Sequence, residues 1–68
     1  MITKTNATIV GIEEGTDNVI VHTKSGFKMD AEWRGLKPPK LNQPVILFER
    51  FNSMNPDFAV EVPSNERG

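Results

Sequence analysis

Strict alternation of apolar and charged residues between positions 27 and 34 is the feature that most constrains the fold of this chain. The stretch reads F-K-M-D-A-E-W-R. Because successive side chains of a β-strand point to opposite faces, this period predicts a strand over Phe27–Trp33 with its apolar residues turned inward. Those residues are Phe27, Met29, Ala31 and Trp33. A strand with one apolar face needs partner strands, so we expect a set of β-hairpins closing over one small core.

Four other segments have the composition of strands. They cover residues 5–12, 19–23, 45–49 and 58–62, and most are rich in β-branched or aromatic residues. Gly11 interrupts the first segment and predicts a bulge or bend there. Lys24-Ser25-Gly26 separates the second segment from the alternating strand, so we expect a tight turn in which Gly26 adopts a positive φ. In the last segment we expect Phe58, Val60 and Val62 to face inward.

The connection from Arg34 to Pro44 breaks the strand pattern. It contains one glycine and three prolines, so it cannot form a regular central strand. One helical turn over residues 32–36 is compatible with the sequence before the Pro38-Pro39 pair ends it. We expect Leu36 and Leu41 to close one end of the core.

Five short strands with turn signals between them predict an all-β protein, a small partly open barrel of OB type or, alternatively, of SH3-like type. The chain has 68 residues and no cysteine, so neither a disulfide nor a Cys-based zinc site supports its small core. We expect a single domain over residues 1–63 and a flexible C-terminal tail over residues 64–68.

Three segments carry a resemblance to a known family. They are Ala7-Thr8-Ile9-Val10-Gly11, the stretch from Val19 to Phe27 with its glycine turn, and Leu41-Asn42-Gln43-Pro44-Val45-Ile46-Leu47. In this order they resemble the S1-like OB-fold family of small β-barrels, which implies an OB-type barrel. The chain differs from the family in having Asn42-Gln43-Pro44 where a Gly-Asp pair is common, and in lacking a basic surplus.

Charge is unevenly distributed along the chain. The net charge is −1 and the pI is about 5.7, which argues against a strongly basic nucleic-acid binder. Residues 22–40 nevertheless contain five basic residues against two acidic ones, a local charge of +3, and the rest of the chain carries −4. The asymmetry is compatible with an ordinary solvated surface and equally with a basic binding face.

Catalytic motifs are absent from the sequence. His22 is the only histidine, no nucleophile elbow surrounds any serine, and no phosphate-binding glycine loop occurs. The acidic residues Glu13, Glu14 and Asp17 lie in a glycine-containing turn that should be solvated. We therefore expect a non-enzymatic protein without a cofactor or a metal site, and a His22 side chain that faces outward or lies at an edge.

The basic segment that contains Trp33 is the first candidate for a binding site. If Trp33 lies on the surface, it offers a platform on which bases stack, within a groove of lysine and arginine side chains; if it points inward, it is the largest core residue. The candidate residues for nucleic-acid or partner binding are Lys24, Phe27, Lys28, Trp33, Arg34 and Lys37.

Two functional hypotheses follow. The first is binding of single-stranded nucleic acid, RNA in preference, through this basic and aromatic face. The second is a protein-interaction module, a small inhibitor or accessory subunit that docks on a larger complex through the apolar loop residues Phe51 and Met54. The small core also predicts self-association into a homo-oligomer. Without an apolar signal segment or membrane span, the expected location is the cytoplasm.

Overall fold

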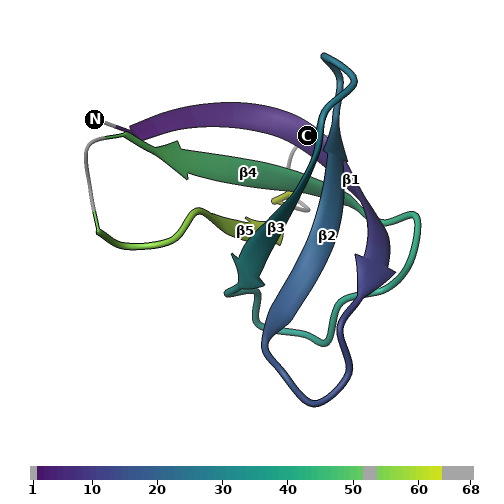
Figure 1. Cartoon of the computed structure of the whole chain (residues 1–68). Coiled ribbons are helices and arrows are strands. Elements are labelled where there is room, and N and C mark those ends of the chain that lie inside the picture. Colours follow the sequence, from purple (N-terminus) through teal and green to yellow (C-terminus); the bar gives the residue numbers. More distant parts are fainter. Residues whose placement is uncertain (1, 52–53, 64–68) are drawn as a thin grey trace.

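The computed structural model describes residues 2–51 and 54–63 and contains five β-strands (Figure 1). No helix occurs among these residues, so the prediction of an all-β five-stranded barrel is confirmed. The strands are β1 (Ile2–Ile12), β2 (Asn18–Thr23), β3 (Lys28–Trp33), β4 (Pro44–Arg50) and β5 (Phe58–Glu61).

The strands form one closed ring in the order β1-β2-β3-β5-β4. Neighbouring strands are antiparallel except β3 and β5, which are parallel. This parallel seam is short, since β3 and β5 pair only through Glu32 with Phe58 and Trp33 with Ala59. The ring is therefore closed, but much of β3 has a partner strand on one side only.

The long strand β1 pairs with two different strands along its length. Its N-terminal part pairs with β4 and its C-terminal part with β2, and Ala7 is opposite Thr23 on one side and Val45 on the other. The register with β2 shifts between Ile9 and Gly11, which confirms the predicted bulge. A Cβ added to Gly11 would lie 3.2 Å from Cδ1 of Ile20, so the missing side chain lets the two strands lie close together at the bend.

Inward-facing side chains from all five strands fill the barrel. The buried apolar residues are Ala7, Ile9, Val19, Val21, Ala31, Val45, Leu47 and Ala59. Met29 and Trp33 are half-buried and pack against this cluster. Because the interior is narrow, its largest fully buried side chains are aliphatic and the aromatic rings lie at its ends or on its outer surface.

The inward face of β5 is the opposite of the predicted one. Ala59 is fully buried and pairs with Leu47, whereas Phe58, Val60 and Val62 lie on the outer side. The segment F-A-V-E-V is apolar at neighbouring positions, so alternation did not settle which set faces the core. The register with β4 settles it, because a residue opposite inward-facing Leu47 must share its face.

Three other predicted core residues are exposed. Phe27 precedes β3, at the hairpin end, and is 65% exposed. Leu36 is 97% exposed and Leu41 is exposed as well, so neither closes the barrel. The helical turn expected over residues 32–36 is also absent, because Glu32 and Trp33 belong to β3 and pair with β5. These predictions were wrong because the barrel ends before it reaches these side chains.

The predicted C-terminal tail, residues 64–68, lies outside the described residues. Within the described ranges, no segment forms a long apolar helix of the kind that crosses a membrane.

Candidate functional site

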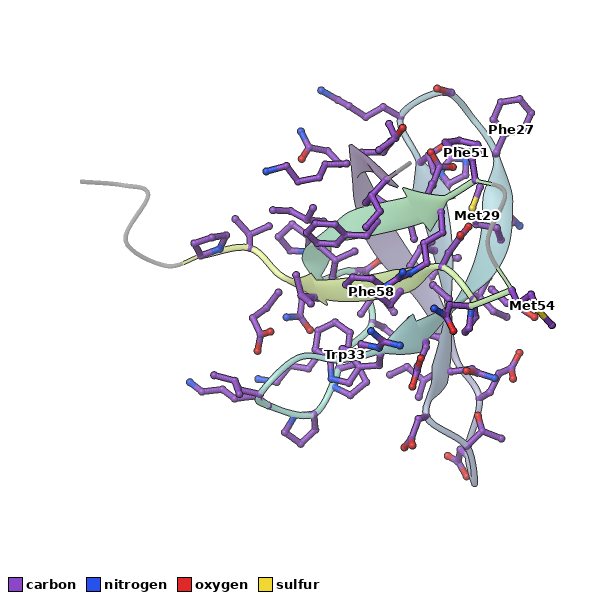
Figure 2. All side chains as sticks on the ribbon, turned by 90° about the vertical axis from the view of Figure 1, so that its left-hand side faces the viewer. Phe27, Met29, Trp33, Phe51, Met54 and Phe58 are labelled. Carbon is purple, nitrogen blue, oxygen red and sulfur yellow. The ribbon has the colours of Figure 1, made fainter. Side chains whose placement is uncertain are left out.

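The structure divides the residues of the sequence-predicted site into two groups. Lys28 begins β3 and Lys24 lies in the turn before it. Phe27 directly precedes the strand and Trp33 ends it, so the two rings lie far apart (Figure 2). A six-residue strand separates its first and last Cα atoms by about 17 Å. Arg34 and Lys37 follow at the Trp33 end. The six residues therefore do not form one continuous surface.

Trp33 is held against the barrel end. Its Nε1–H donates a hydrogen bond to the carbonyl oxygen of Lys37 at 2.8 Å, and the side chain packs against the core. A Cβ on Gly35 would collide with the indole ring, so the backbone of the 34–37 segment lies directly on it. Of the two interpretations left open above, the inward one describes this half-buried ring better than an exposed stacking platform.

The hairpin between β2 and β3 forms an arm that projects beyond the rest of the barrel (Figure 1). Gly26 at its tip has a φ of 97°, as predicted, and donates its N–H to the carbonyl oxygen of Thr23 at 3.0 Å. Lys24, Phe27 and Lys28 are exposed on this arm. The arm carries positive charge and one aromatic ring, but it has no second ring, so a base could not stack between two rings there.

A second group of aromatic and basic side chains lies on the outer face of β4 and β5. Val45 and Leu47 face inward, so Ile46 and Phe48 face outward, and the same alternation turns Phe58 and Val60 outward on β5. Register brings Phe48 opposite Phe58, Ile46 opposite Val60 and Lys4 of β1 opposite Phe48. We call this surface the Arg–Phe face; its members are Lys4, Arg34, Ile46, Phe48, Arg50, Phe58 and Val60.

Phe58 is the centre of the Arg–Phe face. Its ring stacks on that of Phe48 with a centroid distance of 4.8 Å and an interplanar angle of 9°. The guanidinium carbon of Arg34 lies 4.4 Å from the centre of the Phe58 ring, and that of Arg50 lies 5.0 Å from it. Both distances are within the range of cation–π attraction. Figure 2 looks onto β5 from the side on which Phe58 lies.

Two carboxylates lie next to these arginines. Glu32 Oε1 accepts hydrogen bonds from Nε and Nη2 of Arg34 at 3.1 and 2.9 Å. Asp57 Oδ1 accepts the backbone N–H of Arg50 at 2.9 Å. The side chain of Arg50 has no ion pair with any of the described residues, and its Nε is buried without a hydrogen-bond partner among them. The face therefore keeps a small positive excess from Lys4 and Arg50.

Sequence reasoning found Arg34 but missed most of the Arg–Phe face. Phe58 was assigned to the interior, Phe48 was regarded only as part of a strand, and Arg50 was placed in the loop after that strand. The signal that could have found them is the spacing of Ile46, Phe48 and Arg50 at every second position, which places all three on one face. That signal has meaning only once the opposite face is known to supply the core.

An open groove of about 510 Å³ lies where β1 passes between β2 and β4. Its titratable side chains are those of His22 and Lys24, and no carboxylate lines it. His22 is exposed, as predicted. The lining residues are Asn6, Ala7, Thr8, His22, Thr23, Lys24, Pro44, Val45 and Val62.

Glu61 connects β5 to the segment after β3. Its Oε2 accepts the backbone N–H of Leu36 at 2.9 Å and that of Lys37 at 3.3 Å. A hydrogen bond from its own backbone N–H is the largest influence and lowers the pKa of this carboxyl below its ordinary value of 4.5. Desolvation opposes this shift, and the weaker contributions of the bonds from Leu36 and Lys37 add to it. Through these two hydrogen bonds the ionised carboxylate holds the 34–37 segment in place beside Trp33.

The alternative partner site lies on the connection between β4 and β5. Met54 is fully exposed and Phe51 is 46% exposed, so neither side chain belongs to the core. The connection also touches β3, since the N–H of Glu32 donates to the carbonyl oxygen of Asp57 at 3.0 Å.

Within the described part of the chain, no group of three or more histidine, aspartate or glutamate side chains is arranged to hold a metal ion. Comparison with known proteins gives no match to a family model, to a curated protein or to a solved structure.

Proposed function

We propose that this protein is a non-enzymatic OB-type β-barrel that binds single-stranded nucleic acid, RNA in preference to DNA, on its Arg–Phe face. The observation that carries the proposal is the outward-facing stack of Phe48 and Phe58 with two guanidinium groups against Phe58. Support for OB-type connectivity comes from the strand order and from the parallel pairing of β3 with β5.

The face combines the two kinds of group that single strands require. Nucleobases stack on aromatic rings and on guanidinium planes, and they do so with little dependence on sequence. The guanidinium group of Arg34 lies over the Phe58 ring, so a base that stacks on this planar group would lie close to the Phe48–Phe58 pair. Ile46 and Val60 provide apolar surface on the same two strands, over which the next base or sugar could lie.

The basic residues of the face set the expected strength of binding. Lys4 and Arg50 are without an ion pair among the described residues, whereas Arg34 already binds Glu32. Two or three phosphate contacts to a single strand predict that log K falls with log salt with a slope of about −1.4 to −2.1. A weak, salt-sensitive interaction is expected, in keeping with the net charge of −1.

Fluorescence anisotropy of labelled single-stranded RNA and DNA oligonucleotides, at low and at physiological salt, tests the proposal. Lys4→Ala should weaken binding about three- to tenfold at low salt, and Lys24→Ala, which removes the same charge from the arm, should change it little. Arg34→Lys keeps the charge but loses the planar group, so a weaker complex with an unchanged salt slope would identify stacking.

Two outcomes would overturn parts of the proposal. A larger effect of Lys24→Ala than of Lys4→Ala would move the site to the arm, where Lys24, Phe27 and Lys28 are exposed. Absence of binding to both oligonucleotides at low salt would remove the nucleic-acid function itself.

A protein-interaction module is the second candidate function. It is favoured by the exposure of Phe51 and Met54 on a connection between strands, because exposed apolar side chains on such connections often contact partners. The double variant Phe51→Ala, Met54→Ala should keep its fold and lose a partner that the wild-type protein retains. Unfolding of this variant would show that the two side chains have a structural role instead.

A further inference from the structure

The N-terminal half of β3 has an open backbone edge. Along residues 28–32 the strand pairs with β2, but β5 reaches only Glu32 and Trp33. Among the residues that the structure describes, no strand pairs with the β5 side of β3 between Lys28 and Ala31. Backbone groups on this side of β3 therefore lack a strand partner within the described ranges, as do those of residues 2–6 of β1 on the side of β2.

Hydrogen bonds identify which backbone groups point to the open side. Thr23 N–H donates to the carbonyl oxygen of Phe27 at 2.8 Å and Trp33 N–H donates to that of Asp17, so residues 27 and 33 face the β2 side. Glu32 N–H donates instead to Asp57 on the β5 side. Because backbone groups alternate along a strand, the N–H and C=O groups of Lys28 and Asp30 point to the open edge.

The sequence of this edge is complementary to itself. If a second copy lies antiparallel with Met29 opposite Met29, Lys28 of each chain is opposite Asp30 of the other. These become hydrogen-bonded pairs, in which both backbone N–H···O bonds are exchanged, and they place opposite charges side by side on the outer face. Neither side chain has an ion pair within the described part of one chain.

The inner face of the same pairing is apolar. Met29 would meet its counterpart across the two-fold axis, in a pair whose Cα atoms are about 4.5 Å apart. Phe27 would lie opposite Ala31 of the second copy. Phe27 is 65% exposed in the single chain, and Met29 is half-buried, so this arrangement covers apolar surface that the barrel leaves uncovered.

Charge also excludes the neighbouring registers. A shift of two residues in one direction places Lys28 opposite Lys28, and a shift in the other direction places Asp30 opposite Asp30. Both shifts place like charges directly opposite each other, which destabilises a strand pair. A shift of one residue would place Lys28 and Asp30 of one copy opposite residues of the other copy whose N–H and C=O groups point toward β2 and already bond to it. A single register therefore satisfies the hydrogen bonds and the charges together.

We infer that two copies of this protein associate through antiparallel pairing of β3 with β3, centred on Met29. The contact is isologous and closes after two chains. Only residues 27–31 take part, because β5 occupies the edge from Glu32 onward. The dimer is accordingly weak and depends on protein concentration. The inference does not rest on nucleic-acid binding, since it uses neither the aromatic rings nor the arginines of the Arg–Phe face.

Sedimentation equilibrium over a series of concentrations tests the inference. The wild-type protein should show a monomer–dimer equilibrium. Asp30→Lys places lysine opposite lysine, and Lys28→Asp places aspartate opposite aspartate, so each variant should dimerise at least about tenfold more weakly. Both positions are exposed, and unchanged far-UV circular dichroism would show that the variants are folded.

Two matched controls distinguish this register from a general effect of charge. An equimolar mixture of the Lys28→Asp and Asp30→Lys proteins should form a heterodimer, because every charged pair is then opposite in sign. The double variant Lys28→Asp, Asp30→Lys should dimerise like the wild type. A wild-type protein that stays monomeric, a dimer that persists in both single variants, or a mixture that stays monomeric would each overturn the inference.

Discussion

The two ends of β3 belong to the same alternating segment but have different surroundings. At the C-terminal end, Glu32 pairs with both β2 and β5, Trp33 pairs with β5, and the 34–37 segment covers the indole ring. At the N-terminal end, Lys28 and Asp30 pair with β2 alone and Phe27 is exposed. An alternating pattern thus specifies a strand and its two faces, but it does not specify how many neighbours the strand acquires. We expect the C-terminal end, which β5 closes, to determine the stability of the fold. We expect the N-terminal end, which is open on one side, to determine association with a second copy.

The largest expected difference between the two ends concerns their aromatic residues. Trp33→Ala should lower the free energy of unfolding by about 2–3 kcal/mol, because it removes a half-buried ring that packs on the core. Phe27→Ala should change it by less than about 0.5 kcal/mol, since the ring is mostly exposed. Urea unfolding followed by far-UV circular dichroism, at a protein concentration that keeps the chain monomeric, measures both.

If Trp33→Ala and Phe27→Ala lowered the free energy of unfolding equally, the proposed difference between the two ends of β3 would be wrong. Such a result would mean that the arm contributes to the cooperative unit as strongly as the closed end does.

Gly35 offers a more selective way to disturb the closed end. A Cβ at this position would overlap the indole ring of Trp33 and lie 2.5 Å from Oε1 of Glu61. Gly35→Ala should therefore cost about 1–2 kcal/mol of stability through overpacking. In a Trp33→Ala background, Gly35→Ala should lower the free energy of unfolding by less, because the ring that its Cβ overlaps is gone. An equal loss of stability in both backgrounds would show that the contact with the indole ring does not matter.

The smallest expected effect is the dependence on pH that Glu61 contributes. Its pKa is lowered in the folded protein, so its contribution to stability is present above the ordinary value of 4.5 and is lost as the pH falls through the lower, folded value. Glu61→Gln should destabilise the protein slightly at pH 7, and the difference from wild type should shrink at pH 3. Urea midpoints at the two pH values measure it, and a difference that grows toward acid pH would refute the proposed role of the carboxylate.

Local features of the fold could be predicted because short-range geometry controls them. Gly26 takes the positive φ that a tight hairpin turn requires, and Gly11 marks the point at which β1 changes register. The alternation from Met29 to Trp33 identified the correct inward face of β3. Each of these inferences depends on a few consecutive residues and on the fixed period of a strand.

The candidate site could not be predicted to the same extent. Arg34 and Phe58 are far apart in the chain and meet only because β3 and β5 run side by side in parallel. Phe48 and Phe58 meet through the register of β4 with β5. The six residues chosen from the sequence are close neighbours along the chain, but the length of β3 separates them into two groups.

The sequence by itself determined that the chain forms strands, where the turns between them lie, and which residues of β3 face the core. Steric limits on the backbone and the two-residue period of a strand are sufficient for these conclusions. Only the tertiary structure decided which face of β5 is buried, where the aromatic and basic side chains meet, and which part of β3 lacks a second neighbour. Those features depend on register between distant strands, which is fixed when the barrel closes around a narrow aliphatic interior.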